Sequence, residues 1–153
     1  MRQIIIAAVL ASILSTEGHA TANASCSASD ENIDFNFEAL SGQKTAGPFF
    51  GAKATAELLA KEVPEDFRTL SLQNDQAQTW VSGTDFNLHF HRERPADQPF
   101  AEMDLLIETS RKANLDDLVF KGTYKLRLRA APARAEGTKV EVEISGKATC
   151  NND

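Results

Sequence analysis

Two histidines and three nearby acidic residues have the types and the spacing of a metal site. His89 and His91 are separated by one residue, and Glu93 follows two positions later. In a β-strand both imidazoles would project from one face, with their Cα atoms roughly 6.6–7 Å apart. Glu102 and Asp104 begin the facing strand of a predicted hairpin and would add carboxylate oxygens. This mixed set of nitrogen and oxygen donors indicates a periplasmic protein that binds Zn²⁺ or Cu²⁺.

An ordinary charged hairpin explains the same residues without a metal. Histidines on the wet face of a strand would form ion pairs with Glu102 and Asp104. The third histidine, His19, belongs to a segment that we expect to be removed, and Met103 would point to the opposite face. We therefore predict no cofactor, and we keep zinc or copper binding as the alternative.

Residues 121–150, near the end of the chain, contain the strongest strand pattern. Apolar and charged side chains alternate from Tyr124 to Ala130 and again from Lys139 to Ile144, with a turn between them. Because successive side chains of a strand point to opposite faces, each segment predicts one buried face and one wet face. In one hairpin register, opposite charges face each other on the outer side and apolar side chains face each other on the inner side. It pairs Arg129 with Glu141, Arg127 with Glu143, and Leu128 with Val142.

Weaker alternation and turn signals predict the rest of the fold. Further strands are expected at 33–39, 70–72, 78–82, 86–91 and 101–107. Residues 41–51 read as a loop, and 52–63, rich in Ala, Leu, Lys and Glu, predict a helix that Pro64 ends. The expected fold class is therefore mainly β: an antiparallel β-sandwich with one inserted α-helix near residues 52–63.

One local detail favours an immunoglobulin-like form of this sandwich. Gly122–Leu126 looks like a tyrosine corner, in which the hydroxyl of Tyr124 would bond to upstream backbone. The cysteines do not follow the immunoglobulin pattern, because they lie near the two ends of the chain. The sequence therefore predicts the architecture and no family.

Residues 1–24 have the features of a signal peptide. Arg2 gives a basic start, an apolar run covers 4–14, and Ala22-Asn23-Ala24 offers a cleavage site of small residues. Cleavage after Ala20 is a second option. An apolar run of about 11 residues is too short for a membrane helix, so we predict no membrane span. Residues 25–153 would then form a single β-sandwich domain in the periplasm or outside the cell.

Cys26 and Cys150 are the only cysteines of the chain. In an exported protein such a pair predicts a disulfide, which would join the first and last strands. The bond would also restrict the unfolded chain and so stabilise the fold. Two reactive thiols are the alternative, but no C-x-x-C motif supports them.

The charge balance and the motifs restrict the function. The net charge of −6 is spread evenly, which argues against nucleic acid as a partner. Motifs of nucleophile elbows, zinc proteases and phosphate loops do not occur, so we predict no catalytic residues and no enzyme. We expect an exported, non-enzymatic binding or assembly module whose partner is a protein or a small ligand.

Phe49 and Phe50 are the candidate residues for partner contact. Two adjacent aromatic side chains in a loop offer a large contact area. Alternatively, they plug one open end of the sandwich. Trp80, the only tryptophan, is expected in the core.

Overall fold

The computed structural model describes residues 22–43, 46–73, 77–112, 118–131 and 139–152. This part of the chain forms one antiparallel sheet of nine strands in the order β4-β3-β2-β1-β9-β8-β7-β6-β5, which confirms the mainly-β prediction. The strands and the helix are β1 (Ala22–Ser29), β2 (Ile33–Gln43), β3 (Ala46–Leu58), α1 (Glu65–Arg68), β4 (Thr69–Gln73), β5 (Ala77–Ser82), β6 (Asp85–Glu93), β7 (Ala101–Ser110), β8 (Val119–Ala130) and β9 (Val140–Asn152).

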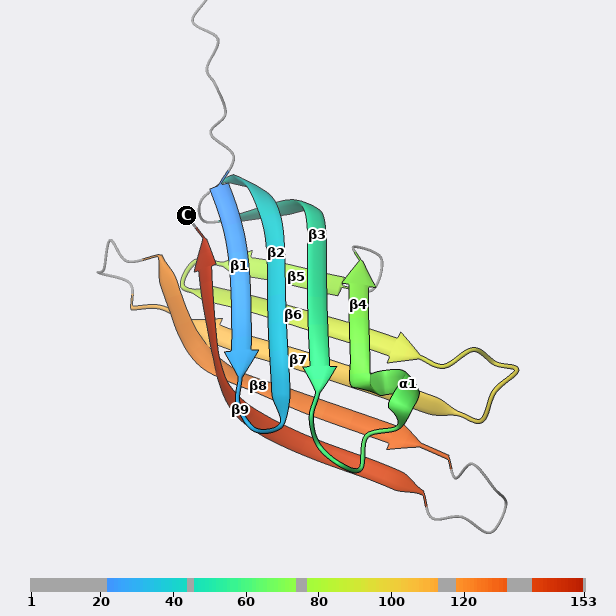
Figure 1. Cartoon of the computed structure of the whole chain (residues 1–153). Helices are drawn as coiled ribbons and strands as arrows, with labels where there is room; N and C mark the ends of the chain where they lie inside the picture. The colour runs from blue at the N-terminus through green and yellow to red at the C-terminus, as the bar shows by residue number, and fades with distance from the viewer. Residues whose placement is uncertain (1–21, 44–45, 74–76, 113–117, 132–138, 153) are drawn as a thin grey trace, which may run out of the picture.

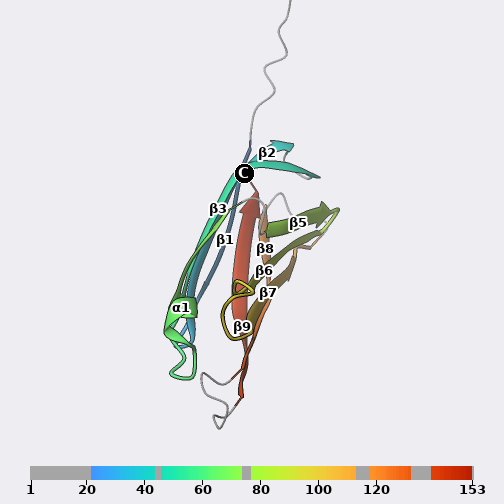
Figure 2. The same ribbon diagram turned by 90° about the vertical axis from the view of Figure 1, so that its right-hand side faces the viewer.

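The sheet folds over so that its two halves lie face to face. Figure 1 shows β1–β4 in front of β5–β8, and the side view in Figure 2 separates the two layers. Aromatic rings from both halves meet between them: Phe35 and Phe37 of β2 lie 5.5 and 6.1 Å from the ring of Phe90 in β6. The core thus lies inside one folded sheet. Every pair of adjacent strands in the described sheet, apart from β1 and β9, consists of neighbours in the chain, so the order lacks the Greek-key connection of an immunoglobulin-like sandwich, and that suggestion is wrong.

β9 connects the two half-sheets. It pairs with β8 along twelve residue pairs but with β1 along only four, from Ala24–Asn152 to Ser27–Thr149. Cys26 and Cys150 are one of these four pairs, with Cα atoms 4.0 Å apart, and their disulfide is buried. The predicted bond between the first and last strands is therefore confirmed, and it crosses the junction of the two half-sheets.

The helix predicted for residues 52–63 is wrong. Residues up to Leu58 continue β3, and the short helix α1 comes later, at 65–68. Ala54 and Ala56 face inward beside Phe37 and Phe35 of β2, so small side chains lie opposite large ones. That packing outweighs the helix propensity of alanine, which is a weak preference. The loop predicted for 41–51 is also wrong where the chain is described, because β2 and β3 extend into it.

α1 closes one end of the folded sheet. Its Phe67 is buried, and the guanidinium groups of Arg92 and Arg94 lie 5.3 and 5.6 Å from the centre of that ring. Arg94 also binds both carboxylate oxygens of Asp66 at 2.8 Å. These contacts attach α1 to the end of β6.

Tyr124 does not form the expected tyrosine corner. Its hydroxyl donates a hydrogen bond of 2.7 Å to the carboxylate of Asp30, in the turn between β1 and β2. The rest of the β8–β9 prediction is confirmed in detail, including the pairs Arg129–Glu141 and Leu128–Val142. Within the described ranges, no helix is long and apolar enough to cross a membrane.

Candidate functional site

His89 and His91 share one carboxylate oxygen on the outer face of the sheet. The alternation of β6 sends both imidazoles outward, and Asp104 of β7 lies directly opposite His91. His89 Nε2 and His91 Nδ1 each lie 3.0 Å from Asp104 Oδ1. Because an ionised carboxylate only accepts, both ring nitrogens donate their N–H to it. The predicted grouping of the histidines with Asp104 is thus present.

The two imidazoles keep Asp104 ionised. Partial burial raises the pKa of this carboxyl, but the hydrogen bonds from His91 and His89 outweigh it, so the pKa lies below its ordinary value. An ionised Asp104 in turn fixes the orientation of both rings. The cluster is therefore a preformed polar feature of the β6–β7 hairpin.

The other two predicted ligands lie apart from this cluster. Glu102 forms an ion pair with Arg129 of β8, and Glu93 lies opposite Glu102 at the end of β6. Over the described ranges, no group of three or more His, Cys, Asp or Glu side chains is arranged to hold a metal ion. Zinc or copper binding stays a prediction, and it would require the imidazoles to exchange Asp104 for the metal.

A shallow hollow of about 340 Å³ adjoins His89 and Asp104 on the outer face of β5–β8. We call it the Trp80 hollow; its lining residues are Trp80, His89, Asp104, Leu106, Lys125 and Arg127. Trp80 is 42% exposed, so its predicted place in the core is wrong. The register explains this, because Trp80 of β5 pairs with Asn87, which points outward from β6. The turn at Gly83, whose φ of 60° suits glycine, sets that register.

Phe49 and Phe50 have opposite environments. The ring of Phe49 stacks on Phe86 inside the folded sheet, with 5.5 Å between centroids. Phe50 is 53% exposed on the outer face, directly opposite Leu40 of β2, which is 47% exposed. Phe49 thus packs inside the fold, whereas Phe50 is exposed and partner contact through it stays a prediction. We call the two outward side chains the Leu40–Phe50 patch.

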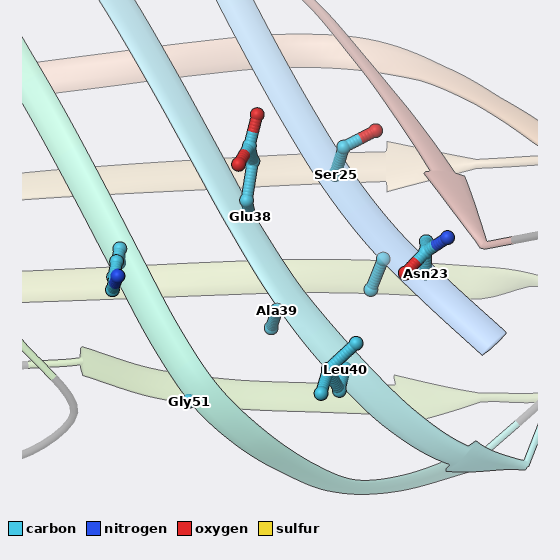
Figure 3. Close-up of a pocket in the computed structure, with 8 residues that line it drawn as sticks. Asn23, Ser25, Glu38, Ala39, Leu40 and Gly51 are labelled. Carbon is cyan, nitrogen blue, oxygen red and sulfur yellow. The ribbon is translucent and has the colours of Figure 1, made fainter. Parts of the chain in front are cut away.

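A second hollow, of about 420 Å³, borders this patch on the outer face of β1–β3. Figure 3 shows Asn23 and Ser25 of β1 beside Glu38 and Leu40 of β2. The ladder between β2 and β3 is irregular between Glu38 and Leu40, and Gly51 opposite has a φ of 59°. The extra residue lies in β3, because one residue of β2 stands between the pairs Glu38–Lys53 and Leu40–Phe50 where β3 has two. Such a bulge re-aims neighbouring side chains, which is how Phe50 comes to face solvent beside Leu40.

Alternation along β2 is enough to place Leu40 on the outer face of the sheet. Ile33, Phe35, Phe37 and Ala39 point inward, so a continued strand places Leu40 outward as an isolated apolar side chain. To predict that Trp80 faces outward, the register of the β5–β6 hairpin at Gly83 must be known as well. Neither hollow can be predicted from the pattern of a single strand, because each is lined by side chains of three or four strands.

Comparison with known proteins gives no assignment. No protein-family model matches the chain, and no curated protein or solved structure is similar enough to count as a match.

Proposed function

We propose that this chain is an exported, non-enzymatic binding module that contacts a protein partner through the Leu40–Phe50 patch. The observation that carries the proposal is the pairing of two half-exposed apolar side chains on neighbouring strands, beside a hollow. Large apolar side chains on a rigid sheet give contact area at little entropic cost. Glu38 and Lys53, a cross-strand pair lining the same hollow, would provide a charged rim.

Export is supported by the disulfide between Cys26 and Cys150. Disulfides persist in oxidising compartments such as the periplasm and the cell exterior. The N-terminal segment with its basic start and apolar run lies outside the described residues, so its role as a signal peptide remains part of the proposal.

Site-specific photo-crosslinking in the source cells tests the binding surface. A photoreactive phenylalanine analogue replaces Phe50 in one version and Thr55, an exposed residue of the same strand, in the other. We expect a discrete protein adduct from position 50 and none from position 55. Sedimentation of the purified chain then shows whether the partner is a second copy. Adducts of equal yield at both positions, or at neither, would refute the proposed surface.

Metal binding is the second candidate, because two imidazole nitrogens approach the same oxygen of Asp104. Calorimetric titration of the mature protein with Zn²⁺ and Cu²⁺ tests it. If His89 and His91 bind the metal, the double change to alanine should abolish the heat of binding. Equal heats from the wild type and the double variant would exclude this candidate.

A further inference from the structure

The Trp80 hollow has one apolar wall and one cationic wall. Trp80 and Leu106 supply an indole and an isobutyl group, and Lys125 and Arg127 lie on the neighbouring strand β8. Its volume of about 340 Å³ falls in the range of small-molecule sites, which is roughly 300–1,000 Å³. The hollow thus combines the two kinds of surface that an amphiphilic small molecule needs.

Strand pairing and hydrogen bonding hold the lining in place. His89, Leu106 and Lys125 lie side by side across β6, β7 and β8 in register. The bond from His89 to Asp104 fixes the imidazole at the edge of the hollow. Since the side chains stand on paired strands of a stable sheet, a ligand would not have to order a loop.

The charges favour an anionic ligand. Lys125 and Arg127 both form ion pairs with the same acid, Glu143, at 3.8 and 3.5 Å. Glu143 is not among the residues that line the hollow, and such exposed pairs are weak, so a bound anion can replace it. The described lining itself holds two cations and one anion, because Asp104, opposite Arg127, stays ionised while it accepts N–H bonds from both histidines. In a chain of net charge −6, this cationic wall is a local exception.

We propose that the Trp80 hollow binds a small aromatic anion. Its ring system would stack on Trp80 and cover Leu106, and its carboxylate, sulfonate or phosphate would accept hydrogen bonds from Arg127 and Lys125. A planar guanidinium can bind such a group through two parallel N–H donors. This site is separate from the Leu40–Phe50 patch, because it lies on the other half of the sheet. The two proposed binding sites are therefore tested independently.

The only tryptophan of the chain lies in this hollow, which makes its fluorescence a direct reporter of occupancy. The probe is 8-anilinonaphthalene-1-sulfonate, and the matched ligand is N-phenyl-1-naphthylamine, which has the same rings without the sulfonate. Energy transfer from Trp80 to each probe is titrated with the folded wild-type protein. We expect saturable transfer with the sulfonate and binding about tenfold tighter than that of the uncharged amine.

Two variants and one control locate the anion contact. Arg127→Gln and Lys125→Gln should each weaken sulfonate binding about tenfold and leave amine binding unchanged. Arg129→Gln is the matched control, because Arg129 lies on the same face of β8 but pairs with Glu102 and does not line the hollow. All variants are first checked for wild-type melting. Equal affinity for both probes, no saturable transfer, or equal losses with Arg129→Gln would overturn the proposal, as would tighter binding of a cationic aryl amine.

Discussion

The hydroxyl of Tyr124 in β8 donates a hydrogen bond to Asp30, a residue 94 positions earlier in the chain. The bond passes over Gly146 of β9, where an added Cβ would come within 2.4 Å of the Tyr124 ring. It lies beyond the point where β1 stops pairing with β9 at Ser27. Tyr124 therefore connects the two half-sheets where their ladder has ended, and Gly146 leaves the space that this contact needs.

Removing this hydroxyl should destabilise the protein. Tyr124→Phe keeps the buried ring but loses one charge-assisted hydrogen bond, and we expect about 1 kcal/mol less free energy of unfolding, measured in urea. Gly146→Ala should cost more, because the Asp30 carboxylate and the Tyr124 ring must both shift to admit the Cβ. Wild-type stability in the Tyr124→Phe protein would show that the bond contributes nothing.

The effect of Tyr124→Phe should depend on pH. Burial raises the pKa of Asp30, but hydrogen bonds from Tyr124 and from the backbone N–H groups of Asn32 and Ile33 outweigh it, so the pKa in the folded state is lowered. A lowered pKa stabilises the fold above the unfolded value of about 3.9, and this stabilisation is lost as the pH falls further. The difference between wild type and variant should therefore be constant near pH 6 and shrink below about pH 4. A difference that does not shrink in acid would contradict this assignment.

The disulfide should contribute more stability than an average contact, because it closes a junction of only four residue pairs. Replacing both Cys26 and Cys150 with alanine should lower the free energy of unfolding by about 2–5 kcal/mol. Hydrogen exchange gives the sharper measurement. Amides of β1 should lose protection first, while amides of β6 and β7 keep it until global unfolding. Uniform loss over all strands would mean that the bond does not act at the junction.

The ion pair of Arg94 with Asp66 should hold α1 in place. Arg94 is 13% exposed and binds Asp66 through two nitrogens, which lowers the pKa of Asp66 mainly through that hydrogen bond. Because Asp66 itself is half exposed, Asp66→Asn should cost only about 1 kcal/mol, measured by thermal melting at pH 7. The wild-type advantage should begin to shrink as the pH falls below about 4 and should vanish only below the lowered pKa of the folded state, where the carboxyl is protonated in both states.

A second ion pair of the same helix provides the control. Arg68 pairs with Glu65 at 3.1 Å, but the Glu65 side chain is 93% exposed. Glu65→Gln should therefore change the free energy of unfolding by less than about 0.5 kcal/mol. If both substitutions had the same effect, the contact between α1 and β6 would not be specific.

Substitutions of the neighbouring residues Phe49 and Phe50 should have different effects, one on stability and the other on partner binding. Phe49→Ala removes a ring that stacks on Phe86, and we expect a loss of about 2–3 kcal/mol because the residue is only partly buried. Phe50→Ala should leave the melting temperature almost unchanged, and with the photoreactive residue placed at Leu40 instead of Phe50 it should abolish the crosslink to the partner. Equal destabilisation by both would mean that Phe50 packs in the fold and is not a contact residue.

The mature chain should begin at Thr21. Ala22 and Ala24 are buried in β1, and Ala24 belongs to the four-pair junction with β9. Cleavage after Ala24 would remove these residues, whereas cleavage after Ala20 leaves β1 whole. Intact-mass measurement of the protein exported by the source cells distinguishes the two positions. A mature chain that begins at Ser25 would contradict this expectation.

Local patterns in the sequence predict most of the β-strands. Strict alternation along Lys121–Cys150 predicts both strands and their register, because a slip by one residue would bury charges and expose the apolar face. The spacing of His89 and His91 likewise places both imidazoles on one face beside Asp104. These features depend on two neighbouring strands, and the residues of two strands are enough to specify them.

Only the tertiary structure decided the rest, because it depends on which strands become neighbours. Ala54 and Ala56 have the propensity of a helix, yet they lie in β3 because Phe37 and Phe35 of β2 leave room for small side chains there. Glu102 turns to Arg129 and away from the histidines because β8 pairs on the other side of β7. The Trp80 hollow needs four strands in order, and the Leu40–Phe50 patch needs a bulge in the β2–β3 ladder. Alternation within one strand fixes which side a residue faces, whereas its neighbours across the sheet are fixed by the packing of the whole chain.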